Sequence, residues 1–176
     1  MQIKFLIFIC LTAQQCRCEC QYNKHILRGY YRNIMHQNSG VLLEQRNSIW
    51  LHLNQVQGLF FRDSIEQDRY TNLQTVGYTS CLQIMCKIRI SLLQNFEINT
   101  LRIWMWDGDV RSYKFSVYAI SENKEKLISI QNAASGVTTI CFPDQHVKEF
   151  VLYNLEGNTR NIQFHIIKIE AFYQFK

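Results

Sequence analysis

The chain has 176 residues, of which 47% are hydrophobic and 19% charged, so it has enough apolar residues for a core and too few charges for a disordered chain. Its formal net charge of +5 is spread along the sequence without a run of Lys and Arg, which excludes the usual footprint of a nucleic-acid-binding protein. With one proline and seven glycines there is no linker rich in these residues, and the composition predicts one domain with a short extension.

Residues 1–39 are predicted to form an irregular N-terminal segment. Lys4 precedes an apolar run at 5–13, which has the length of the hydrophobic region of a signal peptide and is too short to span a bilayer. No good cleavage site of small residues follows it. Two alternatives stay open: residues 1–18 are a cleaved signal peptide, or they are an anchoring extension that remains on the chain.

From residue 40 to 176 the pattern is that of strands. Apolar and other residues alternate with period two, and no sustained 3.6-residue period occurs, which predicts an all-β sandwich or jelly roll. The expected strands begin at 49–54, where Ile49, Leu51 and Leu53 alternate with Trp50, His52 and Asn54. They continue at 86–93, 96–106, 113–121, 126–130, 136–142, 149–153 and 161–175. The last of these is apolar on both faces near its middle, which predicts a central strand.

Two connections stand out because they interrupt this alternation. Residues 63–80 are polar and rich in turn-forming residues, which predicts a long loop. Asp107-Gly-Asp109 separates strands 96–106 and 113–121, and an Asp-Gly pair supplies the positive φ values of a tight reversal. We therefore expect these two strands to meet at that turn.

The segment from Ile98 to Ser121 resembles a discoidin-like domain of the coagulation factor V/VIII C type, which has a galactose-binding-like fold. The resemblance is carried by an alternating strand followed by Trp-Asp-x-Asp-x-Arg-Ser-Tyr, here Trp106 to Tyr113. Weaker similarity at Asp68–Thr79, at 150–158 and at 164–170 extends it over residues 40–174. It implies a discoidin-like jelly-roll β-sandwich. Within the family, the segment looks most like the C-terminal domains of BTB domain-containing protein 9.

That resemblance implies a partner-binding module inside the cell. The cullin-adaptor role of the full-length relative is not carried over, because no BTB domain accompanies the match. The pair of cysteines that frames extracellular members is missing, which disfavours an extracellular lectin-like or lipid-binding role. We accordingly predict that Cys81, Cys86 and Cys141 are reduced, and that Cys81 and Cys86, taken as two residues of one strand, point to opposite faces and do not bridge each other. Cleavage after Cys18 would instead leave four cysteines, an even number that suits disulfides.

The candidate binding residues lie in the two loops, because loops at the end of a rigid sandwich carry function. They are Tyr70, Tyr78, Asp107, Asp109 and Arg111. The three charged residues could hold a cation or a basic group of a partner. The favoured alternative is local structure, with Asp107 accepting backbone hydrogen bonds in the turn and Arg111 pairing with it, since the spacing of an EF-hand loop is absent.

Three further aromatic or titratable side chains are interpreted as structural. Trp104 and Trp106 share a strand face and could form a stacking platform for a sugar, but a place in the core is favoured, above all for Trp106. His165 lies in an apolar strand and is expected to be a satisfied core or edge histidine. The five histidines are scattered and form no zinc-ligand spacing.

The sequence contains no nucleophile elbow, P-loop or dinucleotide fingerprint, so no catalytic activity and no cofactor is expected. The predicted function is a protein–protein interaction module, a structural subunit or adaptor of a larger intracellular assembly. The alternative is a secreted, lectin-like domain that binds carbohydrate or lipid.

Overall fold

The computed structural model describes residues 27–28, 32–35, 39–45, 48–50, 78–106, 108–122 and 124–175. Its strands are β1 (Leu27–Arg28), β2 (Leu42–Gln45), β3 (Ser48–Trp50), β4 (Tyr78–Cys81), β5 (Lys87–Met105), β6 (Tyr113–Ser121), β7 (Lys124–Ala134), β8 (Val137–Asn158) and β9 (Phe164–Phe172). Every regular element in these ranges is a strand, which confirms the all-β prediction. No helix among the described residues is long and apolar enough to cross a membrane.

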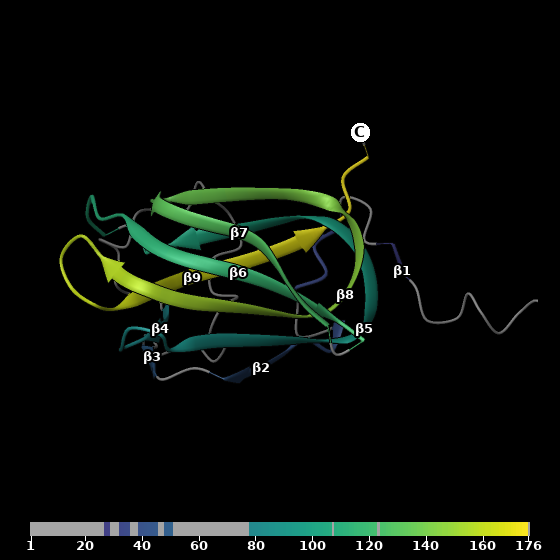
Figure 1. Ribbon diagram of the computed structural model, residues 1–176, viewed down its shortest axis with the longest axis horizontal. Helices are drawn as coiled ribbons and strands as arrows, with labels where there is room; N and C mark the ends of the chain where they lie inside the picture. Colours follow the sequence, from purple (N-terminus) through teal and green to yellow (C-terminus); the bar gives the residue numbers. More distant parts are fainter. Residues whose placement is uncertain are drawn as a thin grey trace, which may run out of the picture.

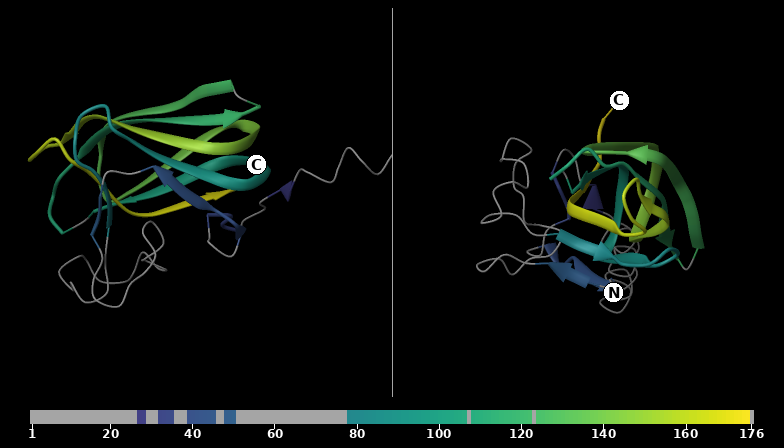
Figure 2. Two further views of the ribbon diagram at one scale, coloured as in Figure 1. Left: turned by 90° about the horizontal axis from the view of Figure 1, so that it is seen from below. Right: turned by 90° about the vertical axis from the view of Figure 1, so that its left-hand side faces the viewer.

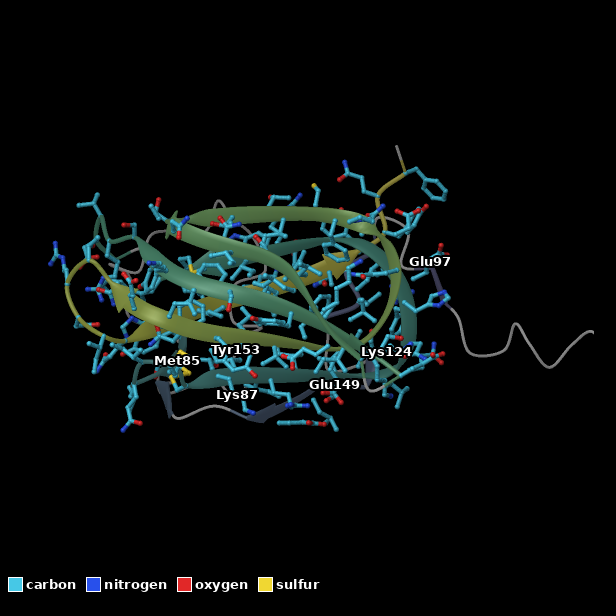
Figure 3. The ribbon with its side chains drawn as sticks, viewed as in Figure 1. Met85, Lys87, Glu97, Lys124, Glu149 and Tyr153 are labelled. Atoms are coloured by element: carbon cyan, nitrogen blue, oxygen red, sulfur yellow. A yellow bond between two sulfur atoms is a disulfide. The ribbon has the colours of Figure 1, made fainter. Side chains whose placement is uncertain are left out.

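Two long strands, β5 and β8, fold one continuous sheet into the two layers of a jelly roll. Both curve back on themselves at the right-hand end of Figure 1. The first part of β5 pairs with the last part of β8, for example Lys87 with Tyr153, which Figure 3 labels. The second part of β5 pairs with the first part of β8, and register shifts mark both bends. One layer therefore contains β4, β9, β5 and β8, and the other contains β5, β8, β6 and β7.

The bend in β8 explains why the sequence suggested two separate strands there. Cys141 pairs with Thr100 and Gln145 pairs with Ile98, with Pro143 in the irregular stretch between. Proline has no N–H to donate to a ladder, so it is tolerated at such a bulge. The strands predicted at 136–142 and 149–153 are thus the two arms of β8.

Large apolar side chains from both layers fill the space between them. Phe115, Phe150 and Phe164 are fully buried, and the rings of Phe115 and Phe164 lie 5.0 Å apart. β9 lies between β4 and β5 with almost every residue buried, which confirms that it is a central strand. The alternation in the sequence therefore located the core correctly.

Part of the N-terminal segment packs on this sandwich. Ile34 and Met35 are buried in the core, and the N–H of Ile34 donates to the carbonyl of Ala171 at 2.9 Å. The side-chain oxygen of Asn33 accepts from the N–H groups of Met35 and Ala171. The boundary at residue 39 stays a prediction, and the proposed signal peptide at 1–18 lies outside the described residues.

The strands on either side of the Asp-Gly turn do not form the expected pair. β5 pairs with β8 and β9, whereas β6 pairs with β7 and β8, so β8 lies between β5 and β6. The stretch after Met105 is therefore an arch that carries the chain across β8. Asp-Gly favours a reversal of direction, but it does not decide which strand becomes the neighbour. That choice depends on residues about forty positions further along the chain.

The prediction for two of the cysteines is also wrong, because Cys81 and Cys86 form a disulfide. Cys81 is the last residue of β4, and Cys86 directly precedes β5, so a turn rather than a continuous strand separates them. Met85 in this turn has φ +62°, which reverses the chain and brings the two Cα atoms to 5.8 Å. This separation is in the usual range for a disulfide. Cys141 is a free, exposed thiol.

Candidate functional site

Two loops meet at the end of the sandwich opposite the bends, on the left in Figure 1 and facing the viewer in the right-hand panel of Figure 2. One follows β5 at residues 106–112, and the other joins β8 to β9 at 159–163. The N–H of Thr159 donates to the carbonyl of Ser112 at 3.0 Å, and the N–H of Ser112 donates to Oγ1 of Thr159 at 3.3 Å. These two bonds fix the loops against each other.

A bidentate ion pair occupies the first loop. Nε and Nη2 of Arg111 donate to Oδ1 and Oδ2 of Asp109, each at 2.6 Å. The hydrogen bonds from Arg111 hold the pKa of Asp109 below its usual value, so this carboxyl stays ionised near neutral pH. Arg160 of the second loop reaches the same carboxylate, with Nη1 at 3.2 Å from Oδ2. One carboxylate thus holds two guanidinium groups.

An aromatic side chain supports this ion pair. The guanidinium of Arg111 lies 4.1 Å from the ring centroid of Trp106, in the range of a cation–π contact. Gly108 packs against the same ring, because a Cβ at that position would lie 2.4 Å from Cζ2 of Trp106. A side chain at residue 108 would therefore displace the indole. The glycine of the Asp-Gly pair allows the backbone to lie directly against the Trp106 ring.

His165 joins the aromatic group from a neighbouring strand. Its ring centroid lies 4.9 Å from that of Tyr78 and 6.3 Å from that of Trp106, with the Tyr78 ring edge-on. The backbone N–H of Trp106 donates to the carbonyl of His165 at 3.3 Å. Strands β4, β5 and β9 therefore bring together three rings that are separated by up to 87 positions in the sequence. Together with the ion pair they form a group that we call the loop-end cluster: Tyr78, Trp106, Asp109, Arg111 and His165.

Both ring nitrogens of His165 have partners. Nε2 lies 3.1 Å from Oε1 of Gln163, and Nδ1 lies 3.4 Å from the hydroxyl of Tyr113. Burial, reinforced by the nearby charge of Arg111, lowers the pKa of His165 to about 4, so the ring is neutral at physiological pH. Burial also raises the pKa of Tyr113, which keeps its hydroxyl protonated and able to donate.

Trp104 has the core position that was favoured for both tryptophans, whereas Trp106, for which it was favoured above all, lies at the loop end. Trp104 is 3% exposed and packs with Ile167, whereas Trp106 is only partly buried and lies beneath Arg111. Trp106 directly follows the last residue of β5, so its side chain reaches the loop end. Trp104 lies within β5, and its side chain packs against Ile167 of β9. Whether a tryptophan lies in the core or at the loop end depends on its distance from the end of the strand, and the alternation does not define where the strand ends.

Of the five predicted binding residues, the structure brings Tyr78, Asp109 and Arg111 to one end of the sandwich. Tyr78 is not in a loop, however, but is the first residue of β4. Tyr70 and Asp107 lie outside the described residues. Arg111 pairs with Asp109, two positions before it, where the sequence suggested Asp107.

Trp106, Arg160 and His165 were not among the predicted binding residues. His165 carried one signal, a polar side chain in an apolar strand, but its neighbours on β4 and β5 could not be inferred from spacing. Within the described ranges, no group of three His, Cys, Asp or Glu side chains is placed to hold a metal ion. The cluster combines partly exposed aromatic rings with fixed hydrogen-bond donors, an arrangement suited to a polar ligand that also has an apolar face.

No family model and no curated protein matches the chain. Solved structures share its fold. One is the carbohydrate-binding module CBM32 of AlyQ in complex with 4,5-unsaturated mannuronic acid, with a TM-score of 0.51 and 15% identity, covering 75% of this chain and 92% of that one. Another is a family 89 glycoside hydrolase from Clostridium perfringens, with a TM-score of 0.53 and 14% identity, covering 76% of this chain and 14% of the hydrolase. These likenesses establish the discoidin-like, galactose-binding-like fold.

The comparisons overturn the predicted function. The AlyQ structure, which shares this fold over 92% of its own chain, is a carbohydrate-binding module. The prediction of an intracellular adaptor or structural subunit is therefore wrong. The comparisons do not support the finer resemblance to BTB domain-containing protein 9. The run from Trp106 to Tyr113 contains the residue that follows β5, the loop-end ion pair and the first residue of β6. It therefore indicates the fold, but it does not distinguish between members that share the fold.

Proposed function

We propose that the chain is a non-catalytic carbohydrate-binding domain and that the loop-end cluster is its binding site. The observation that carries the proposal is the convergence of Tyr78, Trp106 and His165 with the Asp109–Arg111 ion pair at one end of a galactose-binding-like sandwich. The similar structure of AlyQ was obtained with a bound uronic acid. A variant of the glycoside hydrolase, of which the shared fold covers 14%, was obtained with its substrate, GlcNAc-α-1,4-galactose.

The chemistry of the cluster suits a sugar ring. A pyranose has an apolar face of C–H groups, which packs on aromatic rings, and a rim of hydroxyls, which need directed hydrogen bonds. Tyr78 and Trp106 are both partly exposed and supply the rings. Arg111 supplies N–H donors whose direction is fixed by Asp109 and Trp106, so little side-chain entropy is lost on binding.

The disulfide supports a secreted protein rather than an intracellular one. Disulfides persist in oxidising compartments and are rare in the cytosol. The bond between Cys81 and Cys86 closes the turn between β4 and β5, and β4 carries Tyr78. We therefore propose that the domain lies outside the cell, the alternative that the sequence left open.

Substitution of the central aromatic residue tests the proposal. A glycan array would identify bound saccharides, and calorimetry would then give their affinities. Trp106→Ala is expected to weaken binding roughly 30-fold, about 2 kcal/mol, because the variant loses both a stacking surface and the support of Arg111.

Tyr118→Ala is the matched control. Tyr118 is a partly buried aromatic residue on β6, with its ring 5.4 Å from that of Tyr153, and it pairs with Val151 in the middle of β8. Its loss should leave saccharide affinity unchanged. The proposal fails if the folded protein binds no saccharide, or if the two variants lose affinity equally while their circular dichroism spectra remain native.

A further inference from the structure

We propose that the loop-end cluster is selective for an anionic saccharide, one that carries a carboxylate or a sulfate, and that Arg160 is the residue that recognises the negative charge. This inference rests on the proposed function and specifies its substrate class. The structures that share the fold do not decide the matter. One was obtained with an acidic sugar, and the neutral disaccharide in the other is the substrate of a hydrolase of which the shared fold covers 14%.

The first argument is the charge balance of the described side chains at the site. Arg111 and Arg160 each carry a positive charge, and Asp109 carries the one negative charge between them. His165 is neutral at pH 7, since its pKa lies at about 4. These described groups sum to a net charge of +1 at the rim of the site. A ligand of opposite charge would complete the balance.

The second argument is the supply of hydrogen-bond acceptors. Both oxygens of Asp109 are engaged by Arg111, and one of them is also engaged by Arg160. Oε1 of Gln163 faces His165, and Oγ1 of Thr159 accepts from a backbone N–H. A neutral sugar presents hydroxyls that donate as well as accept, and the acceptors named here already have partners. A carboxylate or sulfate only accepts, and therefore matches a site rich in donors.

The third argument is the way in which Arg160 is held. Oδ1 of Asn158 accepts from the backbone N–H groups of Arg160 at 2.9 Å and Asn161 at 3.1 Å. Nδ2 of Asn158 donates to the carbonyl of Gln163 at 2.6 Å. The backbone beneath Arg160 is thus fixed by a side chain at the end of β8. The Arg160 side chain remains 57% exposed.

Exposure leaves most of the donors of Arg160 available. A guanidinium has five N–H groups, and the ion pair with Asp109 uses Nη1. Arg111, by contrast, has a side chain that is 11% exposed and is committed to Asp109 through two bonds. Arg160 is therefore the arginine that a ligand can engage in bidentate fashion, with Arg111 fixed behind it.

The test compares matched ligands by calorimetry with the intact chain. Mannuronate, galacturonate and glucuronate trisaccharides are measured beside the same trisaccharides with their carboxylates reduced to alcohols. A sulfated galactose is measured beside galactose, which distinguishes a carboxylate from a sulfate as the source of charge. At least one acidic ligand is expected to bind roughly tenfold tighter than its neutral counterpart at low salt, and the preference should shrink as ionic strength rises.

Two variants locate the selectivity. Arg160→Gln should abolish most of the preference for the acidic ligand and change affinity for the neutral one less than about twofold, because it removes the charge and keeps a hydrogen-bonding side chain. Lys124→Gln removes the same charge from an exposed residue of β7, at the end of the sandwich opposite the two loops, where Figure 3 labels it. This control should leave the preference intact.

Each other outcome contradicts the inference. Neutral ligands that bind as tightly as their acidic counterparts would refute the selectivity while leaving the carbohydrate-binding function in place. An equal loss of preference in both variants would assign the selectivity to the general charge of the surface and not to Arg160. Failure of the folded protein to bind any ligand, acidic or neutral, on these pairs and on the array would overturn the proposed function as well.

Discussion

Replacing Asn154 with alanine is expected to lower the free energy of unfolding by about 3 kcal/mol, because three hydrogen bonds of a fully buried side chain are lost at about 1 kcal/mol each. Nδ2 of Asn154 donates to the carbonyls of Gln83 at 2.8 Å and Ile162 at 2.7 Å. Its Oδ1 accepts from the N–H of Gly157 at 2.7 Å. Asn154 thus connects the disulfide-closed turn, the end of β8 and the loop that carries Arg160.

Urea unfolding at neutral pH measures this change. Asn132→Ala is the matched control, because Asn132 is an exposed residue of β7, and its loss should alter stability by less than about 0.5 kcal/mol. A loss below about 1 kcal/mol in Asn154→Ala would show that the network around Asn154 does not hold these loops together.

His165 is expected to make the protein less stable as the pH falls from 6.5 to 4. The unfolded chain takes up a proton on this histidine near pH 6.5, whereas the folded chain resists protonation until about pH 4. In that window the unfolded state binds more protons, so stability rises with pH and is lost on acidification. The difference amounts to about 3 kcal/mol across the window and does not grow further below pH 4.

The physical cause is the environment of the ring. An imidazolium at His165 would be buried next to the positive charge of Arg111, and its Nδ1 could no longer accept from the hydroxyl of Tyr113. Since carboxylates also titrate in this range, the unfolding free energy is compared with that of His165→Gln at pH 7 and at pH 4.5. The variant should lose less stability on acidification than the wild type. A pKa near 6.5 for His165, measured by NMR titration, would contradict the account.

The sequence contained enough information for the fold class but not for the connection between the layers. Alternation along β5, β6 and β9 follows from burial on one or both faces, and burial is local enough to be visible in the residue pattern. The arrangement of β8 between β5 and β6 depends instead on pairings between distant segments. No local preference of Asp107-Gly108 encodes those pairings.

The same distinction between local and distant contacts applies to the site. Asp109 and Arg111 are two residues apart, and their pairing at the loop end was within reach of the sequence. The roles of Trp106 and His165 arise from contact between strands 59 positions apart, so a core position was a reasonable expectation for each. The Cys81–Cys86 bond was missed for a local reason: the turn at Met85 is made by a non-glycine residue with positive φ, which spacing does not reveal.

The central claim, that a saccharide binds at the loop-end cluster, is tested most directly by titrating the ¹⁵N-labelled protein with the saccharide that the array identifies. The account predicts that the indole N–H signal of Trp106 and the backbone signals of Arg111, Arg160 and His165 shift together with one binding curve. Signals of Lys124 and its neighbours at the opposite end should stay unchanged. Shifts confined to that opposite end, or to the outer face around Tyr118, would place the saccharide elsewhere and contradict the account.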